Sequence, residues 1–140
     1  MKKVIVDTNV LIDYVNGYTK WLEDVIRYER SEIELVLPTI VIAEYFTSTA
    51  LEKEDEAEVA DRMFSFFRKQ DLNEEIAKVL GAILRRKTYA QGASLADLII
   101  ASSTIYLKGE LATRNKADFA KIPNLRFFNS SAIHLTQKIN

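Results

Sequence analysis

The sequence contains no cysteine, a single histidine and no long apolar run, and each of these absences excludes a class of function. Without cysteine there is no disulfide, thiol nucleophile or thiolate zinc site, and we expect a reducing, cytoplasmic location. The one histidine, His134, lies in a polar C-terminal stretch, which argues against sites built on several imidazoles. We expect neither a signal peptide nor a membrane span, which requires about 18 apolar residues. Any hydrolysis by this chain must therefore use carboxylates.

The composition is that of an ordinary globular protein. Of the 140 residues, 48% are hydrophobic and 28% are charged. This length predicts one domain, residues 1–140, with a single core. The net charge is −1, so the chain as a whole has no field that attracts a polyanion. A nucleic-acid substrate would need a local basic patch or bound cations.

The first apolar run, Val4-Ile5-Val6, ends abruptly at Asp7. Three β-branched residues in succession predict a strand that is buried on both faces, and Asp7 then lies at its carboxyl end. In open parallel α/β sheets, ligands bind at that edge. Two interpretations of Asp7 stay open: a metal ligand, or the cap of a helix that begins at Thr8.

Strands and helices alternate along the rest of the chain, which predicts an α/β fold. Apolar spacing predicts helices over residues 8–16, 21–28, 39–50, 51–70, 71–87 and 94–105, and strands over 33–37, 110–113 and 125–128. The acidic run at 52–61 should be a solvated helix face, followed by a packed apolar stretch at 63–67. A core-facing stripe runs through Ile76, Val79, Leu80, Ile83 and Leu84.

Three further acids stand out, and each has a local explanation as well as a functional one. Glu44 lies within an apolar helical run, where a carboxylate is costly to bury without a cationic partner. It is either an exposed or Arg-paired helical residue or a metal ligand. Asp97 fits a capping box with Ser94, and Asp118 has the same spacing from Asn115.

Parallel strands with right-handed crossovers bring their carboxyl ends to one edge, so these scattered acids would face a common cleft. Carboxylates in one cleft repel one another unless a divalent cation is present, and oxygen ligands suit Mg²⁺ or Mn²⁺. Such ions can activate water and stabilise the oxygens of a phosphodiester that is being cleaved. This chemistry requires neither histidine nor cysteine.

The densest basic cluster, Arg85-Arg86-Lys87, follows the core-facing stripe. Three cations in the last turn of a helix interact favourably with the helix dipole, and this interaction is sufficient to explain their presence there. They are also candidate RNA phosphate contacts, as is Arg114.

Four segments together resemble the motifs of PIN-domain ribonucleases, in particular VapC-type toxins. They are Val4 to Tyr14, Ile42-Ala43-Glu44, Ala96 to Ala101, and Thr113 to Phe119 with its Thr-Arg-Asn-x-x-Asp-Phe pattern. The first and last are the specific ones, and the match spans almost the whole chain in the right order.

The resemblance implies a three-layer α/β/α sandwich with a mainly parallel sheet, a homodimer, and an antitoxin partner that blocks the cleft. It implies that Asp7, Glu44, Asp97 and Asp118 hold one or two Mg²⁺ or Mn²⁺ ions and carry catalysis. It also implies supporting roles, positioning ligands or water, for Thr8, Asn9, Thr113 and Asn115. Asn115 stands where many relatives have a further Asp, which leaves a second ion open.

We therefore predict a metal-dependent endoribonuclease in which metal-held water attacks the phosphodiester and leaves a 5′-phosphate and a 3′-hydroxyl. Two alternatives belong to other classes. One is a phosphoacceptor or phosphatase with Asp7 as nucleophile, although the chain lacks a second Asp two residues later. The other is a catalytically weak PIN-like protein that binds RNA or a partner.

Overall fold

The computed structural model describes residues 1–28, 32–47 and 54–131. Within these residues, four strands form one parallel sheet in the order β3-β2-β1-β4. The strands are β1 (Lys2–Val6), β2 (Ile33–Pro38), β3 (Arg68–Gln70) and β4 (Glu110–Ala112). The chain builds outward from β1 through β2 to β3 and then returns to the other side of β1. The strand order therefore reverses at β1, the position where ligands bind in open parallel sheets.

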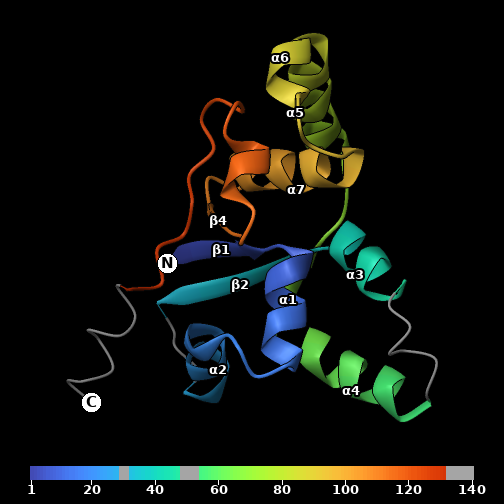
Figure 1. The fold of residues 1–140 in the computed structure, drawn as a ribbon, viewed down its shortest axis with the longest axis vertical. Coiled ribbons are helices and arrows are strands. Elements are labelled where there is room, and N and C mark those ends of the chain that lie inside the picture. Colours follow the sequence, from blue (N-terminus) through green and yellow to red (C-terminus); the bar gives the residue numbers. More distant parts are fainter. Residues whose placement is uncertain (29–31, 48–53, 132–140) are drawn as a thin grey trace.

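Helices cover both faces of this sheet, which confirms the predicted three-layer α/β architecture. Figure 1 shows α1, α2 and α4 on one side and α7, with α5 and α6 beyond it, on the other. The helices are α1 (Thr8–Val15), α2 (Lys20–Arg27), α3 (Thr39–Tyr45), α4 (Glu54–Phe64), α5 (Glu74–Arg85), α6 (Lys87–Ala90), α7 (Leu95–Tyr106) and the 3₁₀ helix η2 (Lys116–Phe119). Helix α3 contacts both α1 and α7 and so joins the two outer layers.

The two central strands form the middle of the core. Val4, Ile5 and Val6 of β1 are fully buried, as the apolar run predicts for a strand covered on both faces. Gly109 allows β4 to approach β1 closely, because a Cβ there would contact Ile5 and lie 2.8 Å from the Lys3 carbonyl oxygen. Buried side chains from the sheet and from both helical layers form one hydrophobic cluster. Among the described residues, no helix is both long and apolar enough to cross a membrane.

Several predicted boundaries are wrong, and short polar elements account for most of the errors. Residues 68–70, predicted to end a helix, form the edge strand β3. The last predicted strand, 125–128, is reduced to a single parallel bridge between Leu111 and Phe127. Helix α6 was not anticipated, and α3 ends at Tyr45. The predicted extension of α3 to residue 50 ends outside the described residues.

Three predicted environments also differ from the structure. Leu84 and Phe66 were expected to pack, but 45% and 54% of their surfaces are exposed. Glu56 was expected to be solvated, yet its Oε2 is buried without a hydrogen-bond partner. Burial, followed by the nearby charge of Glu56, raises the pKa of Tyr45. Glu58 and Asp61 are exposed, as predicted for this acidic face.

Candidate active site

Asp7 is the buried centre of a polar network at the carboxyl end of β1, where only 4% of its surface is exposed. Its backbone N–H donates to the Ala112 carbonyl, which ties it to β4. Its Oδ1 accepts a hydrogen bond from the Thr8 N–H at 2.7 Å. Its Oδ2 accepts from Thr113 Oγ1 at 2.7 Å and from Asn9 Nδ2 at 3.2 Å. The helix-cap interpretation of Asp7 is therefore confirmed, and three donors fix the orientation of its carboxylate.

The environment of Asp7 disfavours the ionised form of its carboxyl group. Burial raises the pKa of its carboxyl group, and the negative charges of Asp97 and Glu44 raise it further. The hydrogen bonds from Thr113 and Thr8 lower the pKa and offset part of this rise. The fold thus brings Asp97 and Glu44, from α7 and α3, into the electrostatic range of Asp7. A cation placed among these groups would relieve the repulsion.

Glu44 is held toward Asp7 by a residue adjacent to that aspartate. Its Oε1 accepts a hydrogen bond from Thr8 Oγ1 at 2.7 Å, and the side chain is half-buried. Thr8 therefore links the two acids: its N–H donates to Asp7 and its hydroxyl donates to Glu44. No ion pair to Glu44 occurs within the described part of the chain, so this contact and the partial exposure of the side chain accommodate the carboxylate in an apolar helix.

Asp97 forms the capping box that the sequence predicted. The Ser94 hydroxyl accepts from the Asp97 N–H, and Asp97 Oδ2 accepts from the Ser94 N–H, both at 3.1 Å. The same carboxylate raises the pKa of Asp7. Asp97 can therefore cap α7 and also act on Asp7, because the first turn of α7 lies near the carboxyl end of β1.

Asp118 is half-buried in η2, and the predicted side-chain cap from Asn115 is not formed there. Instead, the Asp118 N–H donates to the Asn115 carbonyl at 3.0 Å. The Asn115 N–H in turn donates to Thr113 Oγ1 at 3.1 Å. Asn115 is therefore connected to Asp7 through Thr113. The assignment of Asp118 as a metal ligand stays a prediction.

The Asn9 side chain connects the Asp7 network to Arg114. Its Nδ2 donates to Asp7, while its Oδ1 accepts from the Arg114 N–H at 3.1 Å. The Arg114 side chain forms an ion pair with Asp13, with Nε and Oδ2 3.0 Å apart. The sequence analysis gave Asp13 no role and did not anticipate this pair, because the two residues are far apart in the sequence and belong to different motifs.

The other candidate RNA contacts lie elsewhere. Arg85, Arg86 and Lys87 are exposed at the junction of α5 and α6, which Figure 1 shows at one end of the molecule. Among the described residues, no hydrogen bond or ion pair joins them to the acidic network. Only Arg85 lies in the last turn of α5, where it interacts favourably with the helix dipole as predicted; Arg86 is the C-cap and Lys87 begins α6, so the prediction of three cations in one last turn is wrong for these two.

The donor chemistry of this edge fits a divalent metal, although the carboxylates are not arranged as a closed site. Asp7, Glu44 and Asp97 offer only oxygen, the ligand type that Mg²⁺ and Mn²⁺ prefer. Within residues 1–28, 32–47 and 54–131, no group of three or more acidic or histidine side chains converges closely enough to hold an ion. The described carboxylates accept hydrogen bonds from nearby hydroxyl and N–H donors: Asp7 from Thr8, Asn9 and Thr113, Glu44 from Thr8, and Asp97 from Ser94.

A comparison with protein-family models matches residues 4–125 to the family described as the PIN domain. The match covers all the segments whose motifs carry the resemblance seen in the sequence. A comparison with curated protein sequences gives no match.

Solved structures with the same fold include VapBC toxin-antitoxin complexes. VapBC2 from Rickettsia felis, bound to a DNA fragment from its promoter, matches with a TM-score of 0.76 and 24% identity over 91% of this chain and 98% of that chain. DNA-bound VapBC from Salmonella typhimurium matches with a TM-score of 0.77 and 22% identity over 93% and 99%. VapBC-1 from Haemophilus influenzae matches with a TM-score of 0.73 and 22% identity over 92% and 98%. At these identities, the likeness concerns the fold.

Proposed function

This chain belongs to the PIN-domain family, and from that premise we propose that it is a metal-dependent endoribonuclease. The observation that carries the proposal is the environment of Asp7. A carboxylate is buried at the strand-order reversal of a parallel sheet, held by three donors, and destabilised by two neighbouring acids. A buried acid whose pKa is raised by burial and by like charges is typical of a functional site.

Asp7, Glu44, Asp97 and Asp118 are the residues that would hold Mg²⁺ or Mn²⁺, in one or two sites. When bound, the ion supplies a water of lowered pKa and a positive charge beside the phosphodiester oxygens. The chain's own residues position that chemistry. Thr8, Asn9 and Thr113 fix both oxygens of Asp7, and Asn115 supports the Thr113 hydroxyl. Asn115 is neutral, so it adds no charge that would help to retain a second ion.

The biological role that we propose is that of the toxin in a toxin-antitoxin pair. The support comes from the solved structures of the same fold, which include VapBC complexes bound to DNA. On this proposal the chain forms a homodimer and is inhibited by a protein antitoxin. Light scattering of the purified chain, alone and with the product of a neighbouring short reading frame, tests both parts.

The decisive experiment is cleavage of a single-stranded RNA in Mg²⁺ or Mn²⁺ by the wild type and by Asp7→Asn. Exposed Asp71→Asn, which makes the same charge change away from this edge, is the matched control. We expect Asp7→Asn to lose at least about a hundredfold in rate, since even residues that only orient metal ligands contribute about 10- to 100-fold. EDTA should abolish cleavage by the wild type and by the control.

The products distinguish the mechanism. Attack by water gives a 5′-phosphate and a 3′-hydroxyl, so a substrate with a 2′-deoxy scissile nucleotide should still be cleaved. A 2′,3′-cyclic phosphate, or cleavage that persists in chelator, would contradict the proposal.

A second candidate function is RNA binding without cleavage. The observation that favours it is that no metal-holding group is preassembled within the described residues. Normal RNA binding by both wild type and Asp7→Asn, with no cleavage by either in Mg²⁺ or Mn²⁺, would support this alternative.

A further inference from the structure

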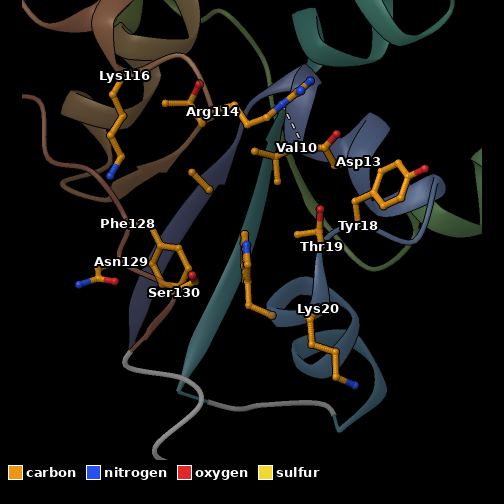
Figure 2. A pocket seen from close by; sticks show the side chains of 13 residues that line it. Val10, Asp13, Tyr18, Thr19, Lys20, Arg114, Lys116, Phe128, Asn129 and Ser130 are labelled. Atoms are coloured by element: carbon orange, nitrogen blue, oxygen red, sulfur yellow. Dashed lines mark ion pairs between the residues drawn. The ribbon is translucent and has the colours of Figure 1, made fainter.

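A pocket of about 420 Å³ lies directly beside the Asp7 network, on the side of β4 that faces α1 and α2. Figure 2 shows Asp13, Tyr18 and Lys20 on one wall, and Lys116 and Phe128 on the other. Its volume falls within the range of small-ligand sites, about 300 to 1,000 Å³. Of the residues that line this pocket, the sequence analysis assigned a role only to Thr113 and Arg114.

The pocket and the acidic site share a wall. Thr113 lines the pocket and also donates its hydroxyl hydrogen bond to Asp7. The next residue, Arg114, lines the pocket while its N–H is held by Asn9, another partner of Asp7. A molecule in the pocket would therefore lie beside the Asp7 carboxylate, separated from it by one side chain.

The charge of the pocket is opposite to that of the acidic site. Lys20, Arg114 and Lys116 contribute three cations, whereas Asp13 is the single acid among the residues that line it, although Lys20 is also paired at 3.2 Å with Asp24 outside the lining. Asp13 holds the Arg114 side chain, which is nonetheless 61% exposed. The net charge of the whole chain is −1, so this local excess of cations is not a general property of the surface. It suits a phosphate group.

Aromatic rings accompany these cations. Tyr18 is 79% exposed at the pocket wall. Trp21 and Phe128 pack with their ring centroids 4.7 Å apart and supply an apolar surface below the charged groups. Cations that contact phosphates, combined with aromatic rings that contact bases, are the features by which proteins bind single-stranded nucleic acids.

We propose that this pocket holds one nucleotide of a single-stranded RNA substrate, next to the phosphodiester that is cleaved. Lys116 and Arg114 contact its phosphate, and Tyr18 contacts its base. Asp13 competes with the phosphate for Arg114 and so limits the affinity for RNA. This inference rests on the proposed nuclease function, because it names where the strand lies relative to the Asp7 site.

The test measures RNA binding without cleavage, so that it does not depend on catalysis. A fluorescein-labelled single-stranded RNA of mixed sequence is titrated with protein in EDTA, and its anisotropy is recorded at several salt concentrations. Lys116→Gln should weaken binding about threefold to tenfold and reduce the salt slope by about one. Lys116→Arg, which keeps the charge, should restore both values.

Two further variants sharpen the result. Asp13→Asn removes the acid that competes for Arg114 and should strengthen RNA binding by about twofold to fivefold, a gain that loss of structure would not produce. Lys78→Gln, on the exposed surface of α5, makes the same charge change as Lys116→Gln outside the pocket and should leave binding unchanged. Thermal melting of each variant verifies that it is folded.

The inference is overturned if Lys116→Gln, Arg114→Gln and Tyr18→Ala all bind RNA as tightly as the wild type. It is also overturned if these variants lose binding to a peptide partner while RNA binding is unaffected, because the pocket would then be a protein-binding site. If RNA binding depends on Lys116 and Asp13 while no cleavage is seen in any metal, the subsite stands and the nuclease proposal fails.

Discussion

The carboxyl ends and the amino ends of the parallel strands, here called the carboxyl edge and the amino edge of the sheet, accommodate charge in opposite ways. At the carboxyl edge, Asp7 is 4% exposed, and burial and two neighbouring acids raise its pKa. At the amino edge, Lys2 and Glu110 form an ion pair 3.4 Å long, with side chains that are 46% and 21% exposed. Both ends belong to the same pair of parallel strands, in which Val4 to Val6 pair with Glu110 to Ala112. The difference therefore lies in the side chains.

This contrast separates stability from function. At the amino edge, Lys2 and Glu110 pair opposite charges close to water. Such an exposed ion pair has a small desolvation cost and contributes little to the free energy of unfolding. The carboxyl edge places an acid where its charged form is disfavoured and surrounds it with donors that only partly compensate. A fold retains such an unfavourable arrangement where an activity depends on it. The substitutions below test this interpretation at both edges.

After Asp7→Asn itself, the largest effect is expected for Thr113→Val, which keeps the shape of the side chain and removes the hydroxyl hydrogen bond to Asp7. Without this donor the Asp7 carboxylate is less well oriented, and its pKa rises further. We expect the rate of metal-dependent RNA cleavage to fall about 10- to 100-fold. Thr113→Ser retains the hydroxyl and should retain most of the activity. Wild-type cleavage by the Val variant would show that this contact does not position Asp7.

Substitutions at the amino edge should change the free energy of unfolding rather than the rate of RNA cleavage. Gly109→Ala places a Cβ 2.8 Å from the Lys3 carbonyl oxygen and against Ile5, so β4 must shift. We expect the free energy of unfolding to fall by about 1–3 kcal/mol, as measured by urea denaturation. Gly81→Ala in α5 is the matched control, because its Cβ meets nothing within 4 Å. That substitution should stabilise the chain by about 0.5–1 kcal/mol.

A pH titration in EDTA should reveal the charge of Asp7. Its pKa is higher in the folded chain than in the unfolded chain, chiefly through burial. The folded state therefore holds the proton more tightly, and the unfavourable contribution of ionised Asp7 is fully present above its folded-state pKa. As the pH falls from neutral toward about 4, the free energy of unfolding of the wild type should rise relative to that of Asp7→Asn. A difference that is constant with pH would contradict the assigned direction.

The smallest effect is expected at the exposed ion pair. A double-mutant cycle of Lys2→Gln and Glu110→Gln should give a coupling of about 0–1 kcal/mol that weakens in high salt. RNA cleavage should not change. A strong coupling, or a loss of cleavage, would mean that the two edges are not as distinct as their exposure indicates.

Much of this architecture follows from local sequence patterns. The apolar run that ends at Asp7 and the capping box of Ser94 and Asp97 were predicted because each depends on residues within a few positions. Strand β3 was missed because it is a three-residue polar edge strand, and its pairing with β2 carries no signal in its own sequence.

The site shows the same limit. The sequence identified Asp7 and Glu44 as unusual acids, but not the Thr8 hydroxyl that links them. The ion pair of Arg114 with Asp13 joins two surface segments that are distant in the chain, so neither residue predicts the other. Motif resemblance named the polar residues around Asp7, and only the tertiary structure shows which atoms they contact.

The hydrogen bond between Asp7 and Thr113 spans 106 positions of the chain. Residues 8 and 9 can meet Asp7 as soon as the first helix forms, but Thr113 arrives only when β4 has docked against β1. Because closing a long loop costs more entropy than closing a short one, we expect this hydroxyl to reach the carboxylate after the contacts of residues 8 and 9 have formed. On the proposed function, the Asp7 carboxylate is therefore fully oriented only in a chain whose first and last strands have paired.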